Sequence, residues 1–320
     1  MHKERLKISV CIVTYNHAAY IHDCLSSVIA QQVDAELEVL VGDDCSSDET
    51  RTIIKQFSDK YPEMIYPIFH KENLGSTRNY QYLINEASGD YIAQLDGDDF
   101  WLPGKLRAQL GFLEENRECS AAYTNAIVIN NSGDLIAKFN GELPPQFDLN
   151  FLLEKGNFLN ASSVMYRAHC KYQVLKVDGP ILDFHAHVLL ASQGYLGYVN
   201  KVLVAYRLNS TTSITTARRD LLMELYWKGI LSAWKLGADE NALRHCMIGF
   251  YRSLIRSALT RGRLKEALLV SDRMATECPL VTRKLFILSV MTLPLFLAKE
   301  MCRMLGRRIF KGGAEILFDR

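Results

Sequence analysis

Short apolar runs alternate with amphipathic stretches along the first hundred residues of the chain. The run at 8–13 is brief and β-branched, as in a buried strand, and residues 20–31 place apolar side chains on one helix face. The alternation recurs three times, with strands expected at 38–41, 65–69 and 91–95 and helices at 49–57, 76–87 and 103–115. This order predicts an α/β fold with a mixed, mostly parallel sheet flanked by helices.

The pattern changes twice further along the chain. Residues 119–208 predict strands at 120–130 and 162–166, a helix at 183–192 and a β-rich pair at 195–206, with Gly133-Asp134 marking a hairpin turn. Beyond residue 215 the strand signals end, and long amphipathic helices are expected at 221–251 and 254–275. We therefore predict an α/β domain at 1–214 and an all-α C-terminal region at 215–320.

Composition narrows the class of protein. The 320 residues carry a formal net charge of +1, which argues against a dedicated nucleic-acid binder. The eight cysteines show no CxxC or Cys/His metal spacing, so reduced, buried thiols in a cytoplasmic protein are expected. The apolar run at 8–13 is too short for the core of a secretory signal.

Polar residues gather where the first four predicted strands end. In open α/β sheets, ligands bind beyond the carboxyl ends of the strands, so these clusters predict one shared site. The clusters are Thr14-Tyr15-Asn16-His17, Gly42-Asp43-Asp44-Cys45-Ser46-Ser47-Asp48, Asn73-Leu74-Gly75-Ser76-Thr77-Arg78-Asn79 and Asp96-Gly97-Asp98-Asp99.

The cluster Asp96-Gly97-Asp98-Asp99 places three carboxylates in four residues. Their mutual repulsion raises the pKa of at least one carboxyl unless a cation neutralises them. Oxygen ligands suit Mg²⁺ or Mn²⁺, which then bridges to substrate phosphates. The alternative is an acidic turn that caps the helix beginning near Pro103, but three carboxylates exceed what capping requires.

The second and third clusters point less specifically to a ligand. Ser47 or Asp48 can cap the helix that follows, whereas Asp43 and Asp44 lie on the strand end, where a carboxylate can accept from a base N–H or a ribose hydroxyl. Arg78 in a first helical turn opposes the helix dipole, so either a bound anion or base, or an ordinary surface position, accounts for it.

Together these motifs resemble those of the family 2 glycosyltransferases, which have the GT-A fold, a Rossmann-like nucleotide-diphospho-sugar transferase fold with an acidic DXD motif. The resemblance covers residues 7 to about 216 and extends to 157–167, Leu182-Asp183-Phe184 and Tyr206-Arg207. It implies that 1–214 is the catalytic domain. It also implies that Tyr15 and Asp44 contact the nucleobase with Arg78 nearby. The predicted donor site comprises Val13, Tyr15, Asn16, Asp43, Asp44, Arg78, Asp96, Gly97 and Asp98.

The resemblance also implies the metal and the base. Mn²⁺ or Mg²⁺ would be held by Asp98 or Asp99, and Asp183 would be the general base. Two positions depart from the family pattern, since Leu182 replaces an acidic residue before the base and Asn209 stands where many members carry His. His185 and His187 are two residues apart on a helix and do not share a face, which favours structural roles for both.

The implied reaction is an inverting, metal-dependent transfer of a sugar from a nucleoside-diphosphate sugar, UDP-linked in most members. The acceptor would be a hydroxyl of a saccharide or lipid-linked molecule in cell-surface polysaccharide biosynthesis. No processive Gln-x-x-Arg-Trp signature occurs, which favours single additions. Two alternatives stay open: a non-catalytic sugar-nucleotide binder of the same fold, and a nucleotidyltransferase, although no Gly-rich basic loop follows the first strand.

The C-terminal end combines an apolar run with a basic one. Residues 285–298 are nearly uncharged and too few to span a bilayer, and residues 299–311 hold five basic side chains against one acidic. This pattern predicts peripheral contact through 285–311 with the inner face of the cell membrane. Burial against the core or in a homo-oligomer fits the pattern equally well.

Overall fold

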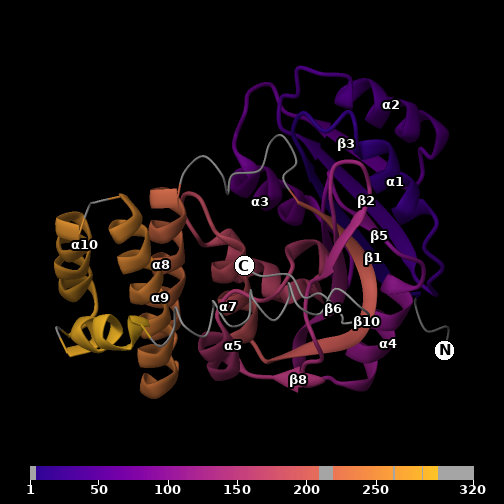
Figure 1. Ribbon diagram of the computed structural model, residues 1–320. Coiled ribbons are helices and arrows are strands. Elements are labelled where there is room, and N and C mark those ends of the chain that lie inside the picture. Colours follow the sequence, from indigo (N-terminus) through magenta and orange to yellow (C-terminus); the bar gives the residue numbers. More distant parts are fainter. Residues whose placement is uncertain (1–4, 209–218, 262–263, 283, 295–320) are drawn as a thin grey trace, which may run out of the picture.

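The computed structural model describes residues 5–208, 219–261, 264–282 and 284–294 (Figure 1). Its first half alternates strands and helices as predicted. The strands are β1 (Lys7–Thr14), β2 (Glu36–Asp43), β3 (Ile65–Phe69) and β4 (Tyr91–Asp96), and the helices between them are α1 (Ile21–Ile29), α2 (Thr50–Lys60) and α3 (Ser76–Glu86). Neighbouring strands pair in parallel in the order β3-β2-β1-β4. Their carboxyl ends therefore meet at one edge of the sheet.

The second half of the sheet is mixed. Its strands are β5 (Phe100–Trp101), β6 (Cys119–Ile129), β7 (Leu135–Lys138), β8 (Gln146–Phe147), β9 (Met165–Arg167) and β10 (Tyr195–Arg207). The sheet continues β4-β9-β6-β10-β5, in which β9 is antiparallel to β4 and β6, and β6 and β10 are parallel. The mixed, mostly parallel sheet predicted from the sequence is confirmed.

Helices cover both faces of the sheet. Ile8, Val10 and Ile12 point from β1 to one face, where they pack with α1, α2 and α4 (Lys105–Glu115). Cys11 points to the other face. There it packs with α3, α5 (Leu149–Lys155), α6 (Lys171–Leu175) and α7 (Asp183–Ala191). The period of two along β1 therefore fills two cores.

Several details of the predicted elements differ in the structure. Residues 195–206 form one strand rather than a pair. The polar Asn200-Lys201 step resembles a turn, but it lies at a shift in the pairing of β10 with β6. Residues 162–166 begin as the 3₁₀ turn η1 (Ala161–Ser163) and become strand only at Met165. The two-residue strands β5 and β8 are too short to leave a periodic signal. The hairpin is confirmed as β6–β7, with Gly133 at φ +86°.

The C-terminal helices form a separate layer beside α5 and α7 (Figure 1). They are α8 (Arg219–Lys235), α9 (Glu240–Arg261), α10 (Leu264–Glu277) and a helix at 284–294. The expected helix at 221–251 is broken because Gly237 adopts φ +80° and Asp239 caps α9 by accepting from the Ala242 amide at 3.0 Å. The Phe184 ring stacks on Tyr226 at 4.3 Å and joins this layer to α7. The boundary proposed at 214/215 lies outside the described residues.

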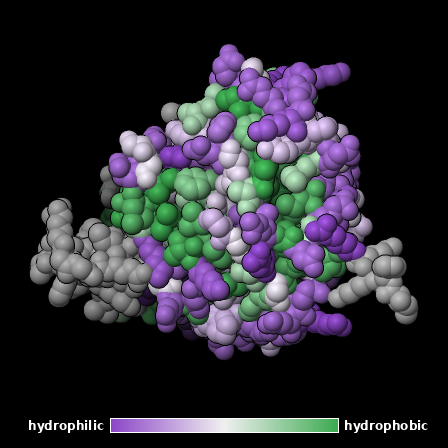
Figure 2. Space-filling model, turned by 90° about the vertical axis from the view of Figure 1, so that its right-hand side faces the viewer, coloured by the Kyte–Doolittle hydropathy of each residue, from purple (hydrophilic) through white to green (hydrophobic). Residues whose placement is uncertain are grey.

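The surface polarity and the free cysteines are typical of a globular protein. On the face turned away from α8–α10, hydrophilic residues cover the edges and hydrophobic side chains show through in the middle (Figure 2). Every cysteine among the described residues is free, and all of these except Cys45 are buried. None of the helices in the described part of the chain has the length and apolar character needed to cross a membrane.

Candidate active site

The acidic turn, residues 96–99, begins where β4 ends. The Asp99 amide donates to the Asp96 carbonyl at 3.0 Å, and the Gly97 amide donates to the Val13 carbonyl at 2.8 Å, so the turn lies against the end of β1. A Cβ at Gly97 would come within 2.7 Å of Thr14 Cβ, which is closer than real side chains approach. Gly97 is therefore required by the close contact between the two strand ends.

Asp99 is the buried member of the turn. Its Oδ2 accepts from Ser162 Oγ at 2.6 Å and its Oδ1 accepts from the Arg207 amide at 2.7 Å. Burial raises the pKa of the Asp99 carboxyl well above its usual range, and the carboxylates of Asp98 and Asp96 raise it further. Metal ligation by Asp99 stays a prediction, but its two oxygens are already engaged, which favours Asp98 as the ligand.

Asp96 connects the acidic turn electrostatically to Asp183. Burial raises the pKa of Asp96 to about 8, and the charges of Asp98 and then Asp183 add to the shift. Residues about ninety positions apart in the sequence thus share one site. Repulsion among these carboxylates favours a bound proton or cation, whichever is available.

The carboxylate oxygens of the acidic turn suit a hard divalent cation that takes only a few of its ligands from the protein. Among the residues that the structure describes, no three or more His, Cys, Asp or Glu side chains are grouped to hold a metal. Mg²⁺ typically keeps one or two carboxylates and completes its coordination with water and substrate phosphates. The Asp96 and Asp98 carboxylates suit that arrangement; Asn209, at the departure from the family pattern, lies outside the described residues.

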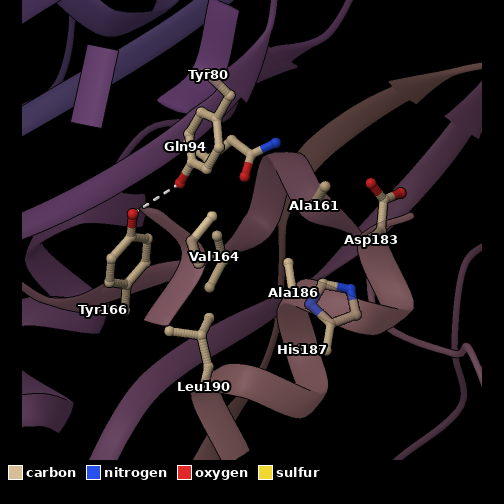
Figure 3. Close-up of a pocket in the computed structure, with 10 residues that line it drawn as sticks. Tyr80, Gln94, Ala161, Val164, Tyr166, Asp183, Ala186, His187 and Leu190 are labelled. Atoms are coloured by element: carbon tan, nitrogen blue, oxygen red, sulfur yellow. Dashed lines mark hydrogen bonds between the residues drawn. The ribbon is translucent and has the colours of Figure 1, made fainter. Parts of the chain in front are cut away.

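Asp183 is the first residue of α7 and is exposed. It lines a cavity of about 20 Å³, room for about one water molecule, together with Gln94 and Ala161 (Figure 3). His187, one turn further along α7, hydrogen-bonds through Nδ1 to the Tyr123 hydroxyl at 2.8 Å. His185 is buried, and burial lowers its pKa to about 4, with a smaller effect from the Lys228 charge. These environments agree with the structural roles expected for both histidines.

Asp44 holds the loop that leads into α3. Its Oδ1 accepts from the Leu74 amide at 2.6 Å and its Oδ2 accepts from the Gly75 amide at 2.9 Å. Asp44 is 3% exposed. Its carboxylate is thus already occupied by backbone donors, whereas the sequence suggested a direct contact with the nucleobase. That contact stays a prediction.

Asp43 is likewise bound within the protein. It is fully buried and pairs with the Arg51 side chain, and its Oδ1 also accepts from the Ser46 amide at 3.1 Å. Asn16 adopts φ +53° and accepts from the Ser47 amide at 2.9 Å through Oδ1. Asp43 and Asn16 therefore shape the turn after β2.

Tyr15 and Arg78 are the most exposed of the predicted donor-site residues. The Tyr15 side chain is 38% exposed, and Arg78 is exposed in the first turn of α3. Val13 lies half-buried in β1 and contributes the carbonyl that holds the acidic turn. Tyr15 and Arg78 are thus available to a ligand at the carboxyl edge of the sheet.

Arg207 supports the acidic turn from β10, a role that sequence reasoning missed. Its Nε donates to the Asp98 carbonyl at 3.1 Å, its Nη1 donates to the Asn130 carbonyl at 2.9 Å, and its guanidinium lies 4.5 Å from the centre of the Tyr20 ring. The Tyr206-Arg207 pair was visible in the sequence, but nothing in its spacing indicated this partner.

The sequence is similar to a known protein family and to proteins from bacteria. The family model for glycosyl transferase family 2 matches residues 9–168, half of the chain. An uncharacterized Mycobacterium tuberculosis protein, Rv1520, is 30% identical over 206 residues, which are 62% of this chain and 58% of that relative. The Bacillus subtilis protein TuaG, provisionally named a teichuronic acid biosynthesis glycosyltransferase, is 31% identical over 262 residues, covering 79% of this chain and 97% of that protein.

Solved structures share the fold at low sequence identity. Staphylococcus aureus TarS 1–349 in complex with UDP-GlcNAc matches with a TM-score of 0.65 at 20% identity, over 88% of this chain and 83% of that one. The mannosyltransferase PcManGT from Pyrobaculum calidifontis, in complex with GDP-Man and Mn²⁺, matches with a TM-score of 0.53 at 16% identity, over 91% and 88%.

Proposed function

Because the chain belongs to glycosyl transferase family 2, we propose that it transfers a sugar from a nucleoside-diphosphate sugar to an acceptor hydroxyl with inversion. The observation that carries this proposal is the convergence of Asp96 and Asp98 in the acidic turn with Asp183 at the start of α7. The acidic turn can face a diphosphate while the separate, exposed carboxylate of Asp183 faces an acceptor. This is the minimum that a single-displacement transfer requires.

We propose a UDP-linked donor and a divalent cation held chiefly by Asp98, with Asp96 beside it. When bound, the cation neutralises charge that develops on the departing diphosphate. The complexes of TarS with UDP-GlcNAc and of PcManGT with GDP-Man and Mn²⁺ support a nucleotide-sugar donor. We expect Tyr15 and Arg78 to contact the nucleoside, since both side chains are exposed at the same edge.

Asp183 performs the proton transfer in this proposal. Its carboxylate accepts the acceptor's hydroxyl proton while that oxygen forms a bond to the anomeric carbon. The bond from this carbon to the diphosphate oxygen breaks, and its electron pair leaves with the diphosphate. The N-terminus of α7 stabilises the anionic form of Asp183 before the transfer. A single displacement inverts the anomeric configuration.

The experiment measures nucleotide release from UDP-sugars and GDP-mannose with and without Mn²⁺. Asp183→Asn should abolish turnover and leave the Kd for UDP unchanged. The control is Asp178→Asn, which alters an exposed carboxylate five residues earlier and should change neither the turnover nor the Kd. Release that does not need a cation would refute the metal assignment. Binding without turnover in the unaltered chain would identify a non-catalytic sugar-nucleotide binder instead.

We propose a saccharide or lipid-linked acceptor in cell-surface polysaccharide assembly. The provisional name of TuaG places that relative in teichuronic acid biosynthesis, which supports this class of product.

We also propose peripheral contact with a membrane through 285–311. The described helix at 284–294 contacts α9 through the rings of Phe286 and Tyr251. It buries Leu285 and Leu293 but exposes Ile287 at 55% and Met291 at 71%. The basic run that follows in the sequence suits anionic lipids. Vesicles containing phosphatidylglycerol should bind the full chain and lose binding to an Ile287→Glu, Met291→Glu variant. The exposed Leu135→Glu serves as the control, and equal binding by the two variants would refute this contact.

A further inference from the structure

A buried serine joins the acidic turn to η1. Ser162 is fully buried, and its Oγ donates to Asp99 Oδ2 at 2.6 Å and accepts from the Asp96 amide at 3.1 Å. One hydroxyl therefore bonds to both the first and the last residue of the turn. A serine hydroxyl has a single proton to donate, and here Asp99 receives it.

The η1 turn is also held by β5 and α4, the two elements that follow the acidic turn. Trp101 Nε1 donates to the Ser162 carbonyl and Gln109 Nε2 donates to the Ser163 carbonyl, each at 2.8 Å. Lys105 is fully buried, donates to Gln109 Oε1 at 2.7 Å and lies 4.0 Å from the centre of the Trp101 ring. Because Gln109 Oε1 accepts this hydrogen bond, the Gln109 NH₂ is directed towards the turn.

The same turn also faces Asp183. Ala161 lines the same cavity as Asp183, together with Gln94 and Ala186 (Figure 3). Consecutive residues of η1 thus lie at the two parts of the site: Ala161 lines the cavity beside Asp183, and Ser162 bonds to the acidic turn. A shift of η1 would move these parts relative to each other.

We propose that Ser162 is a positioning residue that fixes the acidic turn relative to Asp183 and thereby sets the affinity for the donor diphosphate. This rests on the proposed function, because it assigns the turn to the diphosphate. Ser162 acts through the Asp99 carboxylate and the Asp96 amide, and it needs no contact with substrate.

A matched pair of variants tests the proposal in the full chain. Ser162→Ala and Ser163→Ala each remove one fully buried hydroxyl, and Ser163 Oγ donates at 2.7 Å to the Asn160 carbonyl, away from the acidic turn. Thermal melts should show similar losses of stability. Calorimetric titration of UDP with Mn²⁺ should show a Kd about tenfold weaker for Ser162→Ala, as expected for the loss of one buried hydrogen bond. Ser163→Ala should leave this Kd unchanged.

Two further measurements separate positioning from stability. For Ser162→Ala the KM for the donor should rise and kcat should fall, whereas a loss of folded protein alone would lower the apparent kcat at constant KM. The Asp96 amide should exchange its proton faster in Ser162→Ala than in Ser163→Ala, since it loses its acceptor. Equal Kd values for the two variants, or unchanged Asp96 exchange, would overturn the proposal. Failure of the unaltered chain to bind any nucleotide would instead refute the proposed function, and the exchange measurement would still test the positioning.

Discussion

Replacing Asp44 with alanine distinguishes two roles for a carboxylate at the nucleoside side of the site. In the structure the side chain accepts from the Leu74 and Gly75 amides at 2.6 and 2.9 Å. Each hydrogen bond to a charged group contributes roughly 1.5–3 kcal/mol, and water can replace part of both once the carboxylate is removed. We therefore expect the local opening of this loop to become easier by about 2–4 kcal/mol.

Amide hydrogen exchange gives the direct readout. A change of this size corresponds to exchange at Leu74 and Gly75 that is roughly 30- to 1,000-fold faster. The control is Asp48→Ala, because Asp48 also accepts from two backbone amides, those of Ala18 and Thr50, each at 3.0 Å. Its removal should leave exchange in the 74–75 loop unaltered.

UDP titration of the same variants completes the test. If Asp44 acts by holding the loop, the UDP affinity of Asp44→Ala should weaken together with the protection of Leu74 and Gly75. Unchanged protection with weakened UDP binding would refute this reasoning and assign Asp44 to the nucleobase, as the sequence suggested.

Three other outcomes are expected. Burial lowers the pKa of His185 to about 4, whereas a histidine in the unfolded chain has a pKa of about 6.5. As the pH falls from about 6.5 to about 5, the unfolded state binds a proton at this residue and the folded state does not, so the folded state loses about 2 kcal/mol of stability. Urea unfolding should show this loss, and the His185→Gln variant should lack it. Gly97→Ala should cost about 1–3 kcal/mol through contact with Thr14 and weaken UDP binding, whereas Gly111→Ala, with open space in α4, should be neutral or stabilising in thermal melts. Chelation with EDTA should weaken UDP binding without lowering the melting temperature of the nucleotide-free chain, since the described residues contain no three-ligand metal cluster.

Local pattern was enough to predict the first half of the fold. The strand at 65–69 matches β3 at both ends, because a short apolar run bounded by turn residues has few alternatives in an α/β chain. The pattern failed where tertiary pairing decides the structure. Asn200-Lys201 resembles a turn in sequence, yet β6 pairs on both sides of it and keeps β10 as one strand.

The position of the candidate site was predictable for a similar reason. Parallel strands bring their carboxyl ends to one edge, so the strand-end clusters around Tyr15, Asp44 and Asp96 had to lie near one another. The contribution of Asp183 depended on family resemblance, because no local pattern places the start of α7 beside a turn about ninety residues earlier.

The partners of individual carboxylates could not be read from the sequence. Asp44 and Asp99 resemble Asp96 and Asp98 in their strand-end positions, but Asp44 accepts from a loop 30 residues away and Asp99 from the Arg207 amide 108 residues away. Only the assembled sheet brings these donors into reach. The motif therefore predicted a group of acidic residues and not which of them remain available to a ligand.

Burial and hydrogen bonding distinguish the carboxylates that serve the fold from those that remain available to a ligand. A buried carboxylate is costly unless donors surround it, so carboxylates that serve the fold should already have hydrogen-bond partners. Asp44 and Asp99 meet this criterion on both oxygens. Asp96 keeps a pKa of about 8 beside Asp98 and Asp183, because burial and two neighbouring charges outweigh the lowering effect of a hydrogen bond from the Gln94 side chain. Asp96 and Asp98 are half-buried, so a ligand can reach them, and this corner of the site, rather than the acidic motif as a whole, is where the metal and the diphosphate should meet.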